Sequence, residues 1–177
     1  MTELADTRNV VDNYKGMPLD DIVTDLDRQD SGLEIAVENL ERDFNMGTIV
    51  RTANAFGVRH VHVIGRRQWN KRGAMMTDKY LHVHHYASAE AFMAAIAAKP
   101  LIAVDNIEGS IPLSQVALPM SCVLLFGAEG PGISAKLASQ ASQIVAIEQY
   151  GSTRSINVGV AAGIAMYAWL QQHRLRT

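Results

Sequence analysis

Three segments of the sequence place glycines and polar side chains just after predicted strands. The first, FNMGTIVRTANAFG, contains Asn45, Gly47 and Arg51, and its apolar residues recur at helical spacing. Asn45 and Arg51 therefore lie near the beginning of a predicted helix, where unpaired backbone N–H groups attract anions. An N-cap followed by a solvated arginine explains the same residues without any ligand.

The second segment, LLFGAEGPGIS, runs from an apolar strand into Gly127, Gly130 and Gly132, with Glu129 between them. Glycines allow the backbone to approach a ligand closely and to adopt positive φ. The spacing is not GxGxxG, and the segment lacks the Lys-Ser/Thr pair of a P-loop. A nicotinamide-dinucleotide site and a Walker-type site are therefore disfavoured, whereas a tight turn without a ligand explains the glycines equally well.

The third segment, IEQYGSTRSINVGVAAG, begins at the end of a strand predicted at 143–148. Ser155 and Asn157 lie at the beginning of the last predicted helix, where they can cap the helix or bind a ligand. Ligands of open α/β sheets gather at the carboxyl ends of the strands. The three segments together therefore indicate a site more strongly than any one of them does.

Short apolar segments alternate with amphipathic ones, which predicts strands that alternate with helices. This order predicts an α/β fold, with a mostly parallel sheet and helices on both of its faces. Residues 1–31 are expected to form a short, partly helical N-terminal extension, and residues 32–177 the main domain. Strands are expected at 33–37, 58–65, 81–86, 101–105, 121–127 and 143–148, and helices at 18–29, 46–56, 88–99, 133–140 and 155–176.

The chain has 177 residues, of which 48% are hydrophobic and 19% charged, as is typical of one globular domain. No run of about 18 apolar residues occurs, so no membrane span is expected. The first residues are polar and acidic rather than basic and then apolar, which predicts a cytoplasmic location. The single cysteine, Cys122, excludes an intramolecular disulfide and fits a reducing compartment.

The net charge is −2 and the pI about 6.3, which argues against a nonspecific nucleic-acid binder. A local basic patch is still present in the segment RRQWNKR, which can bind phosphates and stack a base, or form a solvated loop. Its candidate RNA-binding residues are Arg66, Arg67, Trp69, Lys71 and Arg72.

The histidines give weaker signals. His82, His84 and His85 resemble a metal cluster, but on a strand His82 and His84 share a face while His85 points away. No acidic residue lies at ligand spacing, so no metal site is predicted. The sequence also lacks a G-x-S-x-G motif, which leaves little support for a hydrolase.

Together, NMGTIVRTANAFG, LLFGAEGPGIS and IEQYGSTRSINVGVAAGIAMY resemble the three motifs of SpoU/TrmH-type RNA ribose methyltransferases in the SPOUT superfamily. The resemblance spans about residues 33–170. It implies a C-terminal half threaded as a trefoil knot, a rare exception to unknotted topology. It also implies a homodimer that uses S-adenosylmethionine to methylate a ribose 2′-hydroxyl of RNA.

The resemblance further implies roles for single residues. Arg51 matches the family's catalytic arginine, but a guanidinium is a poor base at neutral pH. We therefore expect Arg51 to position the ribose and to stabilise the developing alkoxide. Apolar side chains of the cofactor site would sandwich the adenine. The implied catalytic residues are Arg51, Asn45, Glu129, Ser155 and Asn157, and the implied cofactor-binding residues are Val104, Gly127, Ile147, Ser155 and Ile156.

The sequence departs from the family pattern at Glu148 and Gln149, where relatives often have Pro and Met. This departure leaves the RNA substrate open, with tRNA expected rather than ribosomal RNA. Two alternatives belong to other classes of protein. One is an RNA-binding module that keeps the knot without turnover, and the other is a nucleotide-phosphate enzyme that uses the GAEGPG loop.

Overall fold

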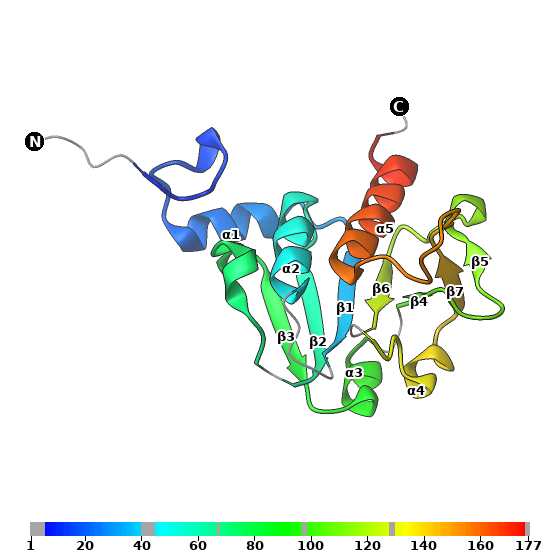
Figure 1. Cartoon of the computed structure of the whole chain (residues 1–177). Coiled ribbons are helices and arrows are strands. Elements are labelled where there is room, and N and C mark those ends of the chain that lie inside the picture. The colour runs from blue at the N-terminus through cyan, green and yellow to red at the C-terminus, as the bar shows by residue number, and fades with distance from the viewer. Residues whose placement is uncertain (1–5, 40–44, 67, 97–98, 128–129, 176–177) are drawn as a thin grey trace, which may run out of the picture.

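The computed structural model describes residues 6–39, 45–66, 68–96, 99–127 and 130–175. In these ranges, seven strands form one sheet in the order β3-β2-β1-β6-β4-β7-β5, and every neighbouring pair is parallel. Figure 1 shows the sheet and its labelled elements. The strands are β1 (Leu33–Asn39), β2 (His60–Gly65), β3 (His82–Tyr86), β4 (Leu101–Val104), β5 (Ile111–Pro112), β6 (Cys122–Phe126) and β7 (Gln143–Ala146).

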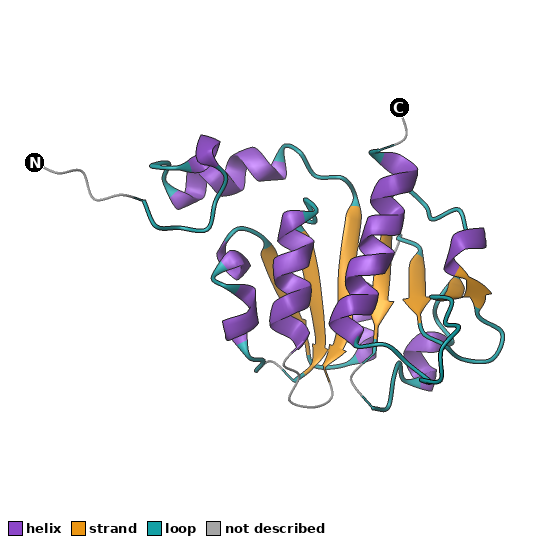
Figure 2. Cartoon of the chain, turned by 45° about the horizontal axis from the view of Figure 1, so that its top comes forward, coloured by secondary structure: helices purple, strands orange, loops and turns teal. Residues whose placement is uncertain are grey.

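The helices lie on both faces of this sheet (Figure 2). They confirm the predicted fold class of a mostly parallel α/β sheet, while the trefoil knot stays a prediction. Among the described residues, no helix is long and apolar enough to cross a membrane. The α-helices are α1 (Leu19–Asp27), α2 (Asn45–Ala55), α3 (Ala89–Ile96), α4 (Ala135–Ala138) and α5 (Val158–His173), and the 3-10 helices are η1 (Asp12–Tyr14), η2 (Lys71–Ala74), η3 (Thr77–Lys79) and η4 (Leu113–Gln115).

Among the strands and α-helices of the described residues, β5 and α4 differ from the sequence-based expectation. β5 lies in a segment expected to be a loop, and it has only two residues at the edge of the sheet. A strand this short has no periodicity, and its Pro112 is tolerated because an edge strand need not donate on both sides. α4 has four residues, fewer than the helix expected at 133–140, and Ser134 caps it by accepting a hydrogen bond from Leu137 N.

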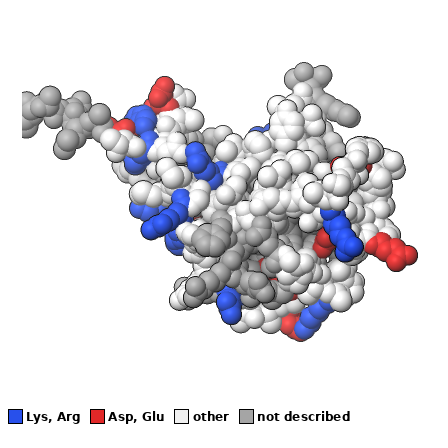
Figure 3. Space-filling view, in the orientation of Figure 1, with Lys and Arg blue, Asp and Glu red and all other residues white. Residues whose placement is uncertain are grey.

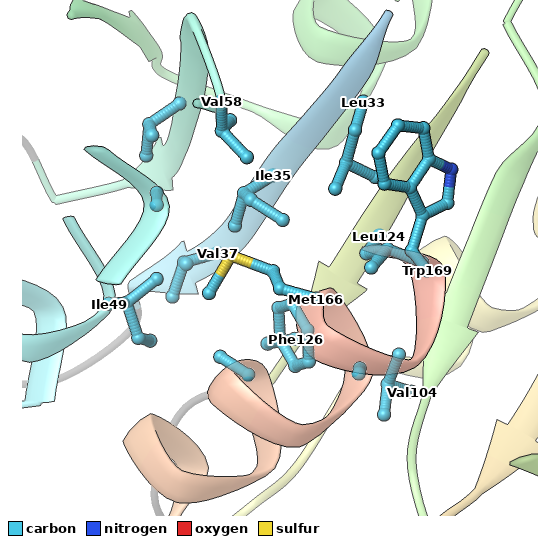
Figure 4. Packing of buried hydrophobic residues seen from close by; sticks show 14 of the residues in the cluster. Leu33, Ile35, Val37, Ile49, Val58, Val104, Leu124, Phe126, Met166 and Trp169 are labelled. Carbon is cyan, nitrogen blue, oxygen red and sulfur yellow. The ribbon is translucent and has the colours of Figure 1, made fainter. Parts of the chain in front are cut away.

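The larger part of the core lies between one face of the sheet and the helices α2 and α5. Ile35 and Val37 of β1 point to this face, because alternate residues of a strand share a face. Figure 4 shows them beside Ile49 of α2 and Met166 and Trp169 of α5. A second cluster covers the opposite face, where α3 and α4 contribute side chains such as Phe92 and Leu137.

Cys122 is fully buried in β6, in the middle of the sheet. Burial raises the pKa of its thiol to about 12, so the thiol stays protonated and unreactive at neutral pH. Cys122 is therefore an inert residue of the core.

The N-terminal segment packs against the rest of the chain through α1 and lies to one side of the sheet (Figure 1). Ile22 of this helix is fully buried. Asp27, its last residue, accepts a hydrogen bond from Arg59 Nε at 2.8 Å. The Arg59 side chain is only 2% exposed, and its Nη1 donates to the Tyr80 carbonyl at 2.6 Å. This buried arginine therefore anchors α1 to the segments around Arg59 and Tyr80.

An Asp27→Asn variant is expected to lower the free energy of unfolding by about 2 kcal/mol, because it leaves the buried Arg59 guanidinium without its counter-charge. Urea denaturation at neutral pH measures this loss. Asp21→Asn changes an exposed acid of the same helix and is expected to stay within about 0.5 kcal/mol of wild type. Equal losses in the two variants would contradict the proposed anchor.

Histidines and a glutamate form a polar cluster on strands β1, β2 and β3. The register pairs Glu34 with His60 and His60 with His82, so the side chains share one face. His62 Nε2 lies 2.8 Å from Glu34 Oε2, and Lys99 also bonds this carboxylate. His60 Nδ1 lies 3.0 Å from His84 Nε2. The described residues contain no group of three or more His, Cys, Asp or Glu arranged to hold a metal ion.

This cluster makes the fold sensitive to acid. Burial would raise the pKa of Glu34, but hydrogen bonds from His62 and Lys99 outweigh it and lower the pKa from 4.5 to about 2. Burial lowers the pKa of His60 and of His84, which favours their neutral rings. In each case the unfolded chain binds protons more readily, so the free energy of unfolding falls as the pH falls.

A Glu34→Gln variant tests this sensitivity. At pH 7 we expect a loss on the order of 3 kcal/mol in the free energy of unfolding, because the ionised carboxylate no longer stabilises the fold. The difference between the free energies of unfolding of variant and wild type is largest above pH 4.5. It disappears as the pH falls towards 2, where Glu34 itself becomes protonated. Denaturation across this pH range measures it, with the exposed Glu90→Gln as control. A difference independent of pH would contradict the assignment.

Candidate functional site

A pocket of about 300 Å³ lies at the carboxyl ends of three neighbouring strands, β6, β4 and β7. All five residues that the family resemblance implies for cofactor binding line it. They come from the end of β4 and from the two loops that follow β6 and β7. These residues are Val104, Gly127, Ile147, Ser155 and Ile156, and the pocket is completed by Asp105, Asn106, Phe126, Gly130, Gly132, Gln149, Asn157, Val158 and Ala161.

Asp105, which follows β4, holds the loops around the pocket together. Its Oδ2 accepts a hydrogen bond from Ile133 N at 3.0 Å, and its own N–H donates to the Val145 carbonyl at 3.0 Å. The next residue, Asn106, donates from Nδ2 to the Arg154 carbonyl at 3.2 Å. Sequence reasoning missed both residues, although an acid at the end of an apolar strand was a usable signal.

The glycines after β6 are needed for close backbone packing. A Cβ at Gly127 would lie 2.1 Å from the carbonyl carbon of Gly132 and 2.3 Å from Ile133 N. Gly132 has φ +71°, and a Cβ there would lie 2.8 Å from Asp105 Oδ2. Around Gly130, by contrast, nothing lies within 4 Å of a Cβ position, and this residue lines the pocket. The same loop is therefore tightly packed at Gly127 and Gly132 and open towards the pocket at Gly130.

The first and third segments meet where α2 and α5 begin. Asn157 Nδ2 donates to Asn45 Oδ1 at 3.0 Å. Asn157 Oδ1 also caps α5 by accepting from Gly159 N at 3.0 Å and Val160 N at 3.2 Å. The capping expected for Asn157 is therefore present, and the same side chain links the pocket to the beginning of α2. Sequence spacing alone could not show this contact, which joins residues far apart in the chain.

Arg51 lies further along α2, about 9 Å beyond Asn45 at 1.5 Å of rise per residue. Its side chain is exposed, while the buried residues of α2 face the sheet. Among the described residues that line the pocket, Arg51 is not included. Glu129, the other charged residue expected in the site, lies outside the described residues.

The expected RNA-binding residues lie in the segment that follows β2 and in the first half of η2. Trp69 is half-buried and packs against the larger core cluster. Lys71 Nζ lies 5.5 Å from the centre of the Trp69 ring and also pairs with Asp78 at 2.8 Å. Arg66 and Arg72 are exposed, and Arg67 lies outside the described residues. The exposed cations can contact phosphates, whereas the packing of Trp69 limits how much of its ring a base can reach.

Comparison with known proteins identifies relatives of this chain. It is 26% identical over 147 residues to the tRNA (guanosine(18)-2'-O)-methyltransferase of Borreliella burgdorferi, a match that covers 80% of this chain and 67% of that protein. It is 27% identical over 155 residues to the 23S rRNA (guanosine-2'-O-)-methyltransferase RlmB of Acinetobacter baylyi, with coverages of 83% and 62%. A crystal structure of an AdoMet-bound rRNA methyltransferase from Sinorhizobium meliloti matches with a TM-score of 0.71 and 26% identity, covering 78% of this chain and 56% of that one.

The chain thus spans about two thirds of the length of these two curated relatives. The model of the SpoU rRNA Methylase family matches residues 32–167, which include α2, all strands of the sheet and the three loops around the pocket. The chain therefore belongs to the SpoU rRNA methylase family.

Proposed function

We propose that this chain transfers the methyl group of S-adenosylmethionine to a ribose 2′-hydroxyl of RNA. The observation that carries the proposal is the pocket, in which all five cofactor residues implied by the sequence motifs come together. The activities named for the relatives from Borreliella burgdorferi and Acinetobacter baylyi support the same reaction. Residues 32–177 would form the catalytic domain and residues 1–31 a short extension of it.

The residues around the pocket fit S-adenosylmethionine. A volume of about 300 Å³ is at the lower end of the range for small-molecule sites. Val104, Ile147 and Ile156 offer apolar surface for the adenine, while main-chain atoms of Gly127 and Gly130, which line the pocket, can bind the polar parts of the molecule. When bound, S-adenosylmethionine supplies a methyl group on a positively charged sulfur that needs no further activation. The protein has to hold the donor and to orient the acceptor hydroxyl.

The acceptor hydroxyl must lose its proton, and Arg51 would stabilise the alkoxide that develops. A guanidinium does not act as the base at neutral pH, so the proton leaves through a phosphate or water. Asn45 and Asn157, bonded to each other beside the pocket, would orient the ribose. Ser155 lines the pocket and would close it over the donor. Glu129 would fix Arg51 and the loop after β6.

A homodimer would complete the site. α5 exposes Val160, Ile164 and Tyr167, with exposed fractions of 55%, 40% and 47%. A row of apolar side chains on one helix suits contact with a second copy. Arg51 lies on α2, which packs directly beside α5. An interface formed on α5 would therefore bring a second copy close to Arg51, which stands apart from the pocket of its own chain.

Transfer RNA is the substrate we propose first, with ribosomal RNA as the alternative. The two curated relatives differ in this respect, since one is named for tRNA and the other for 23S rRNA. The exposed cations Arg66, Lys71 and Arg72 would bind the phosphates of either RNA.

Methyl transfer from tritiated S-adenosylmethionine to deproteinised tRNA and rRNA tests the proposal. The expected result is label in RNA, recovered as a 2′-O-methylnucleoside after nuclease digestion and mass spectrometry. Label in rRNA alone would overturn the choice of tRNA. Calorimetric binding of the donor without any transfer would instead support an RNA-binding module. Binding of ATP in place of the donor would support a nucleotide-phosphate enzyme.

A further inference from the structure

Two consecutive methionines between η2 and η3 have an unusual backbone. Met75 has φ +48° and Met76 φ +64°, and no other non-glycine residue in the described ranges has a positive φ. The left-handed region is costly for residues with a Cβ, and such strain is concentrated at functional sites. Both side chains are also largely exposed, Met75 by 55% and Met76 by 59%. Two apolar side chains are thus exposed to solvent on a backbone conformation that lowers the stability of the fold.

The segment that carries them is held firmly against α2. A Cβ at Gly47 of α2 would lie 2.8 Å from Gly73 Cα and 2.8 Å from Ala74 N, so the two backbones are in direct contact. Ala74 is fully buried, and its carbonyl accepts a hydrogen bond from the buried Thr77 hydroxyl at 2.6 Å. The two methionines are therefore fixed on both sides by packed residues, and they form a rigid projection rather than a mobile loop.

Cations outnumber the acid around this projection. Lys71 and Arg72 precede it and Lys79 follows it, on the short helices η2 and η3, while Asp78 of η3 pairs with Lys71 at 2.8 Å. Figure 3 shows Lys and Arg side chains on the side of the molecule that carries these helices. Gly47, which contacts the projection's base, lies one helical turn before Arg51 on the same stripe of α2. Exposed apolar side chains between cations suit a ligand with flat apolar faces and negative charges.

We propose that Met75 and Met76 bind a base of the substrate RNA next to the target nucleotide, while Lys71, Arg72 and Lys79 contact the flanking phosphates. This inference rests on the proposed function. It assigns to Met75 and Met76 the positioning of a nucleotide of the RNA. Thioether side chains are flexible at their ends and polarizable, so they pack well against aromatic faces of differing shape. Apolar side chains that separate or support bases are a common means of holding a distorted nucleic acid.

Glycine substitution separates this role from a structural one. Met75→Gly combined with Met76→Gly relieves the left-handed strain, so the thermal midpoint should stay the same or rise. The variant is expected to bind tRNA about 10-fold more weakly in fluorescence anisotropy, with a matching loss in kcat/KM for tRNA. Affinity for S-adenosylmethionine, measured by calorimetry, should not change. A loop with only a structural role would give unchanged tRNA binding.

Two further variants keep the result interpretable. Met75→Gln with Met76→Gln preserves side-chain length but removes apolarity, and it should weaken tRNA binding to a similar extent. Met120→Ala removes another exposed methionine, 61% exposed and located just before β6, and should leave tRNA binding unchanged. Wild-type tRNA affinity in both double variants overturns the inference. Absence of methyl transfer by the wild-type chain overturns the proposed function instead, and the anisotropy measurement still decides the role of the methionines.

Discussion

A Gly127→Ala variant is expected to show no detectable binding of S-adenosylmethionine. Its free energy of unfolding is expected to fall by about 3 kcal/mol. The added Cβ would lie 2.1 Å from the carbonyl carbon of Gly132 and 2.3 Å from Ile133 N. Both atoms belong to the backbone, so the overlap is relieved only when the loop after β6 moves away. That loop forms one wall of the pocket. Isothermal calorimetry with the methyl donor and urea denaturation measure the two effects.

Gly163→Ala is the matched control. This glycine lies within α5, and the nearest atom to its Cβ position is Thr52 Cγ2 at an ordinary 3.8 Å. Alanine is a better helix former than glycine by about 1 kcal/mol, so this variant should be as stable as wild type or more so. Its affinity for S-adenosylmethionine should be unchanged. Wild-type affinity in Gly127→Ala would mean that the donor binds elsewhere in the chain.

Arg51→Ala is expected to lower the rate of methyl transfer by about 100- to 1,000-fold, the usual cost of removing one group that stabilises developing negative charge. Binding of S-adenosylmethionine should be unaffected, because Arg51 is exposed on α2 and does not line the pocket of the described residues. Single-turnover assays with saturating tRNA measure the chemical step apart from RNA binding.

Two further variants show whether the lower rate of methyl transfer in Arg51→Ala is specific to this guanidinium. Arg28→Ala removes an exposed cation just after α1 and should retain the wild-type rate. Arg51→Lys keeps the charge without the planar guanidinium, and an intermediate rate would show that geometry matters as well as charge. If Arg51→Ala methylates tRNA at the wild-type rate, Arg51 has no role in the chemical step.

Much of the fold followed from local patterns. β1 and β6 are apolar segments long enough to identify, and α5 has the length and the Asn157 cap of a predicted helix. Their order alone predicts a parallel sheet, because each strand is followed by a helix or a long connection. β5 was missed because two edge residues carry no periodic signal.

Contacts between distant residues could not be predicted in this way. Arg59 is buried although it is charged, because Asp27, 32 residues earlier in the chain, neutralises it. The Glu34–His62 contact depends on strand register, which the sequence does not specify by itself. The local pattern shows which residues of a strand share a face. Which residue of the neighbouring strand lies opposite each of them depends on the register of the whole sheet.

The candidate site was predictable in part for the same reason. Gly127 and Ile147 follow strands, and the carboxyl ends of parallel strands meet at one edge, so their convergence needed only the topology. Asp105 was missed because its carboxylate accepts a hydrogen bond from the backbone N–H of Ile133, which lies on another loop. The sequence motif identified Arg51, but spacing along the chain could not show that this residue is exposed on α2 and does not line the pocket.

The buried thiol of Cys122 also gives the chain a built-in reporter. It sits on β6 between β1 and β4, so reagents reach it only when the centre of the sheet separates. Alkylation rates under native conditions therefore measure how often the molecule opens globally, rather than how its loops fluctuate. For the same reason, one cysteine introduced on the surface would be the sole site for a fluorescent label, without any need to replace the native residue.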